Sequence, residues 1–152
     1  MAALALEPAF EVRATVGAPQ DIGLFAGVSR RLIPITGGTF EGPQFKGSVL
    51  PGGADHQLVR EDGFTQLEAR YMLQTDAGEK IYVINRGVRY GSAEVLARLN
   101  AGERVDPSLI YFRTTPSFET AAPRLQWLVH SVFVGIAERY PAEVVVRFYR
   151  VP

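Results

Sequence analysis

Charged and polar side chains interrupt the apolar segments of this chain at a few positions, and these residues could do chemistry. Glu68 and Arg70 share one face of the most regular alternating segment, and Asn85 shares a face of the next segment with Arg89. Arg113 interrupts a third segment. Because a buried charge is costly unless it is paired, inward-facing side chains of this kind must form a network, and such networks shift pKa values in ways that catalysis can use. The same polar faces could instead simply contact water.

A second candidate group lies around Pro116. Arg113 and Glu119 flank this proline-stiffened bend, where they could clamp a carboxylate and hold a general acid or base. They could equally form a structural ion pair. Trp127, the only tryptophan, could line a pocket or belong to the core. His130 alternates with the apolar residues that follow it, so we expect it to point into a buried space.

The motifs of nucleotide binding and of common covalent catalysis are missing from the sequence. The chain has no phosphate-binding loop, no dinucleotide-binding glycine motif and no G-x-S-x-G nucleophile elbow. It has no cysteine, which excludes a thiolate zinc site and a cysteine nucleophile. The two histidines, His56 and His130, would need a carboxylate such as Asp55 or Glu119 to complete a zinc site, so we expect no metal and no cofactor.

Two glycine-rich clusters lie at residues 36–42 and 51–55. Neither leads into a predicted helix, so neither offers a helix N-terminus to a phosphate group. We expect tight turns and close backbone approach at both clusters, and the alternative is that they form the rim of a pocket.

Charge and hydropathy limit the classes of partner. The 16 basic and 16 acidic residues cancel, so nothing favours attraction to nucleic acid or to an anionic membrane. No apolar run approaches the roughly 18 residues of a membrane helix, and the N-terminus lacks the basic region of a signal peptide. Together with the absence of cysteine, these features predict a cytoplasmic protein.

The elements that must position the candidate residues are mostly strands. Alternation predicts strands at residues 9–16, 30–36, 45–50, 64–75, 80–88, 108–115, 128–139 and 142–151. One helix is expected between Ser92, a good N-cap, and Gly102, and it should plug or cover one end of a barrel. A further helical turn is possible near residues 124–127. The sequence therefore predicts one all-β, mostly antiparallel domain over residues 1–152, a closed or nearly closed β-barrel with one short α-helix.

Several segments resemble the family known as domain of unknown function 3237, a group of small bacterial proteins. The resemblance is carried by residues 30–43, 47–55, 69–71, 75–78, 111–119 and 127–128. It implies a compact β-barrel and a homodimer, and it supplies no activity. Asp55 and Gln57 match the family pattern, whereas His56 stands where the family often has an aromatic residue. Because the polar residues recur within family motifs, the resemblance favours a pocket over a face that merely contacts water.

We therefore predict a small-molecule-binding barrel that is a cofactor-independent enzyme using general acid–base chemistry, of isomerase, cyclase or lyase type. Its substrate would be a small, partly apolar carbonyl, phenol or carboxylate compound. The alternatives are a non-catalytic ligand-binding barrel and a structural dimerisation module with a solid core. The predicted catalytic residues are Asp55 or Glu68 as base and Arg70 and Arg113 as anion clamps; the predicted substrate contacts are Gln57, Asn85, Tyr111, Glu119, Trp127 and His130.

Overall fold

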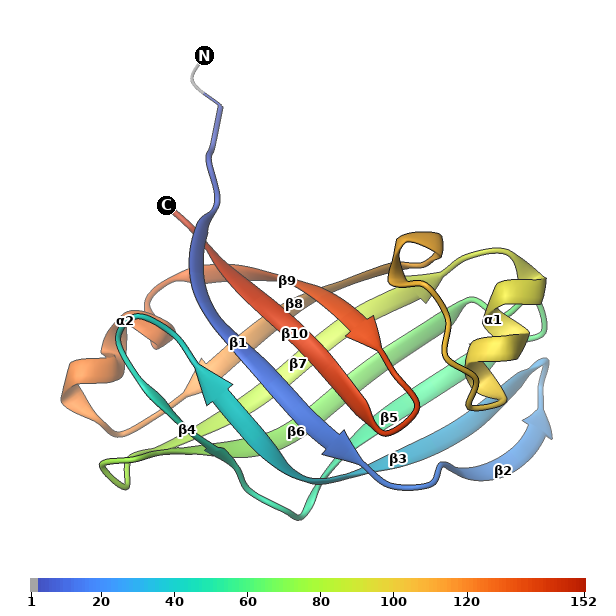
Figure 1. Cartoon of the computed structure of the whole chain (residues 1–152), viewed down its shortest axis with the longest axis horizontal. Helices are drawn as coiled ribbons and strands as arrows, with labels where there is room; N and C mark the ends of the chain where they lie inside the picture. The colour runs from blue at the N-terminus through green and yellow to red at the C-terminus, as the bar shows by residue number, and fades with distance from the viewer. Residues whose placement is uncertain (1–2) are drawn as a thin grey trace.

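Over residues 3–152, which the computed structural model describes, ten antiparallel strands build the molecule (Figure 1). The strands are β1 (Glu7–Val16), β2 (Gln20–Phe25), β3 (Val28–Glu41), β4 (Lys46–Val49), β5 (Gly53–Arg60), β6 (Thr65–Thr75), β7 (Lys80–Tyr90), β8 (Tyr111–Glu119), β9 (Val132–Arg139) and β10 (Glu143–Val151). All eight strands predicted from alternation overlap an observed strand. Two strands, β2 and β5, were not predicted.

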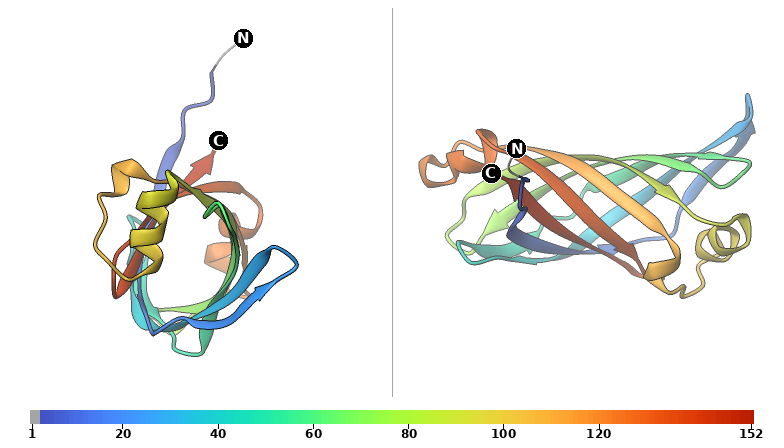
Figure 2. Two further views of the ribbon diagram at one scale, coloured as in Figure 1. Left: turned by 90° about the vertical axis from the view of Figure 1, so that its right-hand side faces the viewer. Right: turned by 90° about the horizontal axis from the view of Figure 1, so that it is seen from above.

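The sheet closes into an antiparallel barrel with eight strand positions. Its order runs from β1 through β10, β9, β8, β7 and β6 to β5, then to β3 and back to β1. β4 and β5 share one position between β3 and β6, because each pairs with both of these long strands at a different level. β2 pairs only with β3, and the β2–β3 hairpin projects beyond the barrel (Figure 2).

Short helices lie at opposite ends of the barrel (Figures 1 and 2). At one end is α1 (Ala93–Asn100), where the Ser92 Oγ caps the helix by accepting a hydrogen bond from the Val95 N–H at 3.2 Å. At the other end a 3₁₀ turn, η2 (Pro123–Leu125), leads into α2 (Gln126–Val129). Another 3₁₀ turn, η1 (Pro107–Leu109), precedes β8. The predicted helix and its place at a barrel end are therefore confirmed, and no helix over residues 3–152 has the length and hydropathy to span a membrane.

The half of the barrel next to α2 is filled by aromatic rings, here called the aromatic cluster. Its members are Phe10, Phe40, Phe45, Phe118, Phe133, Phe148 and Trp127. Ring centroids in this cluster lie 4.9 Å apart for Phe10 and Phe45 and 5.5 Å apart for Phe118 and Phe148. Edge-to-face contacts of this kind add to the stabilisation from apolar burial. This half of the interior is therefore solid.

The glycine cluster at residues 36–42 is not a turn, because β3 runs through it to Glu41. Gly38 has a φ of +129°, and a Cβ built on it would lie 2.0 Å from the carbonyl oxygen of Arg13 on β1. A side chain cannot be accommodated there, so the close backbone approach expected at this cluster is confirmed. The second cluster does contain a turn, at Pro51 and Gly52, and β5 begins directly after it at Gly53.

Candidate functional site

Between the aromatic cluster and α1, the barrel interior contains a cavity lined by residues from all eight strand positions. Its walls are mainly apolar, with Val12 and Ala14 on β1 and Val144 and Val146 on β10 as examples. The centres of water-sized molecules have about 40 Å³ open to them in this cavity. Since one water needs roughly 10–15 Å³ by this measure, the space holds a few waters or a small organic group.

Five polar side chains face this cavity, and each has one atom that is sealed from solvent without a hydrogen-bond partner within the protein. The atoms are Asp55 Oδ1, Gln57 Oε1, Asn85 Oδ1, Arg89 Nε and Thr114 Oγ1. Only one other side-chain atom of this kind occurs over residues 3–152, the Trp127 Nε1. Native proteins pair the great majority of their buried polar atoms, so the concentration of unpaired atoms around one cavity makes this cavity the candidate functional site.

The register of the sheet brings the carboxyl and amide groups together. Asp55 on β5 lies opposite Ala69 on β6, which in turn lies opposite Asn85 on β7. Because Ala69 has only a methyl side chain, it leaves space between its two polar neighbours. Gln57 Nε2 donates a hydrogen bond of 2.8 Å to Asp55 Oδ2, which fixes the carboxyl group, while its Oδ1 has no hydrogen-bond partner within the protein.

Burial determines the ionisation of the site. Burial raises the pKa of Asp55, although the hydrogen bond from Gln57 and the charge of Arg89 act in the opposite direction. A carboxyl group whose pKa is moved toward neutrality is suited to accept and return a proton. Burial and the charge of Asp55 also raise the pKa of Tyr71, so its hydroxyl stays protonated in the cavity wall. Arg89 remains cationic at neutral pH, because burial lowers its pKa only to about 10.

The cavity adjoins a wider opening at the α1 end of the barrel, here called the mouth. The centres of water-sized molecules have about 240 Å³ open to them in the mouth. The mouth is bounded by the end of α1, the β1–β2 connection and the β9–β10 turn. Arg31, Arg89 and Arg139 line it, and the last two also line the cavity. Arg89 Nη2 donates to Asn100 Oδ1 at 3.0 Å, and its guanidinium lies over the ring of Phe112. The cavity thus opens past three arginines.

Three of the predicted site residues, Asp55, Gln57 and Asn85, line the cavity together. Glu68 and Arg70 do not, because they lie on the outer face of β6. There Glu68 pairs with Arg70 at 3.1 Å and with Arg86 at 2.5 Å, and these three side chains are partly or largely exposed. The sequence left open whether the polar face of β6 points inward or contacts water, and the structure shows the second alternative for Glu68 and Arg70, because the apolar face of β6 fills the interior.

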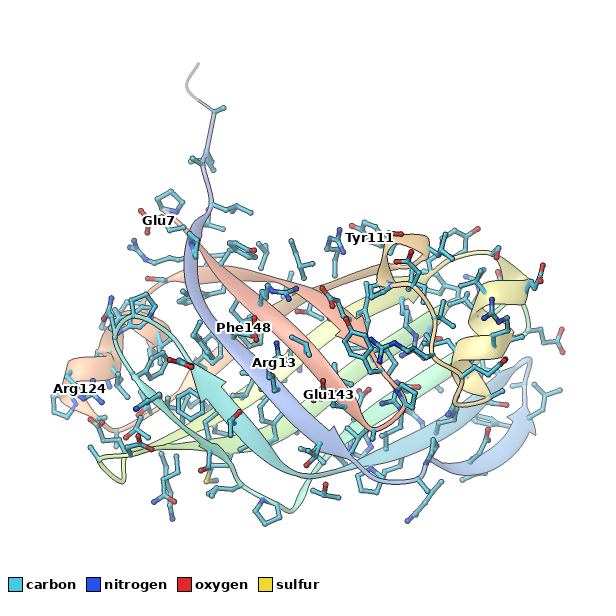
Figure 3. The ribbon with its side chains drawn as sticks, in the orientation of Figure 1. Glu7, Arg13, Tyr111, Arg124, Glu143 and Phe148 are labelled. Atoms are coloured by element: carbon cyan, nitrogen blue, oxygen red, sulfur yellow. The ribbon has the colours of Figure 1, made fainter. Side chains whose placement is uncertain are left out.

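The predicted residues of β8 also lie outside the barrel. The guanidinium of Arg113 lies 5.0 Å from the ring centroid of Tyr111, whose side chain is 55% exposed at the molecular surface (Figure 3). Glu119 is exposed at the end of the same strand. The inward positions of β8 belong to Phe112, Thr114 and Phe118. Arg113 therefore does not reach the cavity that contains Asp55.

Trp127 and His130 are located away from the cavity. Trp127 packs against Phe45 and Phe133 in the aromatic cluster, as its alternative assignment to the core expected. His130 is exposed at the end of α2, so the expectation that it points into a buried space is wrong. Both faces of β9 are apolar, and the inward face is the one that begins with Phe133, whereas Val132 is 68% exposed.

Several residues of the site were not among the predicted contacts. They are Arg31, Tyr71, Arg89, Thr114 and Arg139. For Arg89 a signal was present, because it shares a strand face with Asn85 and with the buried Ile81 and Val83. No three His, Asp or Glu side chains come together as a metal centre would require, within the part of the chain that the structure describes.

Comparison with known proteins places this fold and sequence in one family. Residues 4–151 match the family described as "Protein of unknown function (DUF3237)". A UPF0311 protein from Rhodopseudomonas palustris (strain TIE-1) is 44% identical over 142 residues, which cover 93% of each chain. The crystal structure of a conserved protein of unknown function from R. palustris aligns over 100% of both chains, with 42% identity and a TM-score of 0.96.

A more distant structural match is an enzyme from Penicillium herquei. Its crystal structure aligns over 100% of this chain and 97% of its own, with a TM-score of 0.74 and 20% sequence identity, which shows a common fold. The family match over nearly the whole chain agrees with the resemblance found in the sequence, and the chain belongs to the DUF3237 family.

Proposed function

We propose that the cavity binds a small, partly apolar molecule and that the protein is a cofactor-independent enzyme in which Asp55 transfers a proton. The observation that carries this proposal is a group of five polar side chains that line one mainly apolar cavity, each with a buried atom that has no hydrogen-bond partner in the protein. Ligand sites are commonly built in this way, with a few polar groups set in an apolar wall to orient the bound molecule.

The arrangement can perform proton transfer next to a carbonyl or phenol oxygen. In an isomerisation or a cyclisation, Asp55 would remove a proton from carbon or oxygen and return it elsewhere on the same molecule. In an elimination, it would remove a proton from carbon and pass it to the leaving group as that group departs. Gln57 holds the carboxyl group in place through its hydrogen bond to Oδ2. Negative charge that develops on the substrate oxygen would be stabilised by Arg89 and Thr114, which line the same cavity and carry polar atoms without a partner in the protein.

Two further points support catalysis on this scaffold. The enzyme from P. herquei has the same fold, so a barrel of this shape is compatible with enzymatic activity. The raised pKa of Asp55 also distinguishes it from the outward-facing Glu68, whose pKa is lowered chiefly by its hydrogen bond with Arg70. Of the two bases that the sequence suggested, Asp55 is the better one, because it lies in the cavity.

Exchange of hydrogen for deuterium tests the proposal without knowledge of the natural substrate. Wild-type protein is incubated in D₂O with a panel of small cyclic and aryl ketones and phenols, and deuterium incorporation at carbon is measured by NMR. Asp55→Asn should reduce the catalysed exchange by a factor of about 10²–10⁴, the usual contribution of a general base, while ligand binding persists. Glu68→Gln is the matched control and should leave exchange unchanged.

Binding measurements on the same panel separate the alternatives. Ala69→Phe places a ring between Asp55 and Asn85, so it should abolish binding while the barrel stays folded. Binding that Ala69→Phe removes, with no exchange for any compound, would identify a non-catalytic ligand-binding barrel. Exchange that survives in Asp55→Asn would refute the role of Asp55. If no compound binds in a manner sensitive to Ala69→Phe, the cavity is not a ligand site.

A further inference from the structure

The mouth of the cavity carries an excess of positive charge. Arg31, Arg89 and Arg139 line the mouth, and Arg89 and Arg139 also line the adjoining cavity, where Asp55 is the acidic residue. The chain as a whole has a net charge of zero, so this excess is local. A concave, partly apolar space with a surplus of one sign of charge attracts ligands of the opposite sign.

The three arginines are not used to hold the fold together through ion pairs. Over residues 3–152, eight other arginines form ion pairs with Asp or Glu side chains, and these three do not. Arg31 is only 9% exposed and Arg89 only 2%, so both guanidinium groups are withdrawn from water to a large degree. Arg139 donates to the backbone oxygen of Tyr140 at 2.7 Å. Like charges gathered in this way destabilise a protein unless an anion lies among them.

The arginines lie at different depths along the barrel, from the mouth to the cavity. Arg31 on β3 lies opposite Gln57, and Ile33 lies opposite Asp55, so Arg31 is two residues nearer to the mouth than Asp55. Two residues of a strand span about 7 Å. Arg31 lines the mouth and not the cavity, whereas Arg139 lines both. The backbone positions of Arg31 and Asp55 therefore lie at different depths of the barrel, with Arg31 nearer to the mouth.

We propose that the ligand is a small organic acid, whose carboxylate is bound at the mouth by Arg31 and Arg139 while its apolar body enters the cavity and reaches Asp55. This inference rests on the proposed function and narrows its substrate class from carbonyl, phenol or carboxylate compounds to carboxylates. Arginine suits this role because its planar group donates two parallel hydrogen bonds to a carboxylate. Arg89, deeper in the barrel, stays available for charge that develops on the reacting part.

Matched acids and amides test the inference. The probes are benzoate, phenylacetate and 3-phenylpropionate, each compared with its neutral amide by calorimetry or NMR titration. At least one acid should bind wild-type protein ten-fold or more tightly than its amide, and added salt should weaken only the acid. Arg31→Met and Arg139→Met should each reduce the affinity for that acid about ten-fold and leave the affinity for the amide unchanged. Arg113→Met, on the outer face of β8, is the control and should change neither affinity.

The outcomes distinguish this inference from the function on which it rests. If amides bind as tightly as acids in wild-type protein, or if both weaken equally in Arg31→Met and Arg139→Met, the carboxylate assignment is wrong. The same is true if ketones exchange deuterium through Asp55 while no acid is preferred, and the proposed function then stands alone. If no acid, amide, ketone or phenol binds in a manner sensitive to Ala69→Phe, both the inference and the proposed function are wrong. Because the acid–amide comparison uses wild-type protein, it decides the matter even if an arginine variant does not fold.

Discussion

Asp55 should make the folded protein less stable at neutral pH than a neutral side chain would. Its Oδ1 is sealed from solvent without a partner in the protein, and burial raises its pKa despite the nearby positive charges. Asp55→Asn keeps an acceptor for the 2.8 Å hydrogen bond from Gln57 and removes the buried negative charge. Because a buried charge without a partner costs more than a buried neutral amide, we expect the free energy of unfolding to rise by about 1–3 kcal/mol. For a domain of this length the gain corresponds to roughly 2–12 °C in Tm.

The direction of the Asp55 pKa shift determines how the stability of the folded protein depends on pH. The folded-state pKa of Asp55 lies above its unfolded value of 3.8, so the folded state binds the proton more tightly than the unfolded state does. Wild-type stability at this site is therefore greatest below the unfolded pKa and is lost as pH rises through the folded pKa. Asp55→Asn should match wild type near the acidic limit and exceed it at neutral pH.

Urea unfolding of both proteins at several pH values between 4 and 8 is the appropriate assay. Asp106→Asn provides a control of opposite sign, because the pKa of Asp106 is lowered by the backbone N–H of Ser108, which donates to it at 2.9 Å. Stability from Asp106 is present above its unfolded pKa and is lost as pH falls, so its variant should be less stable than wild type at neutral pH. If Asp55→Asn is less stable than wild type at pH 7, the carboxylate is stabilised by the arginines more than burial opposes it, and the reasoning fails.

Three further substitutions test the packing described above by urea unfolding. Phe148→Ala should lower the free energy of unfolding by about 3–5 kcal/mol, because the ring is 1% exposed within the aromatic cluster, and an unchanged midpoint would contradict that packing. Gly38→Ala should destabilise far more than Gly27→Ala, since the new Cβ meets the Arg13 carbonyl at 2.0 Å whereas nothing lies within 4 Å at Gly27; equal losses would mean that φ alone matters. Ser92→Ala should cost about 0.5–2 kcal/mol through loss of the α1 cap, and a neutral result would show that the capping hydrogen bond is dispensable.

The barrel could be predicted from the sequence wherever one face of a strand is apolar and the other polar. On β6 the apolar residues Leu67, Tyr71 and Leu73 point inward, so alternation alone placed Glu68 and Arg70 on the outer face. The prediction that Glu68 and Arg70 are catalytic required the opposite orientation, and the structure favours the outward one. On β9 both faces are apolar, so alternation had no power to choose between them.

The site was predictable only where a polar residue interrupts an otherwise apolar inward face. Asn85 and Arg89 do so on β7, after Ile81 and Val83. On β5 the polar residues replace the apolar face altogether, which concealed the strand itself and left Asp55 and Gln57 to be found through the family resemblance. Arg31 gave no signal, because it follows another arginine and nothing in the pattern shows which of the two points inward. The homodimer stays a prediction.

One half of the barrel interior is filled by aromatic rings, and the other contains the cavity with its polar side chains. The rings stabilise the fold and the polar side chains form the proposed site, whereas many proteins use the same residues for both. Substitutions around Asp55 change hydrogen bonding and charge, but they leave the interlocked rings at the α2 end untouched. The polar positions of the cavity, such as Gln57 and Asn85, should therefore tolerate exchange without unfolding of the barrel, whereas the apolar wall belongs to the same core as the rings. One scaffold of this kind can be adapted to different ligands by changing a few inward positions of β5, β7 and β8, which makes it a suitable starting point for redesign of specificity.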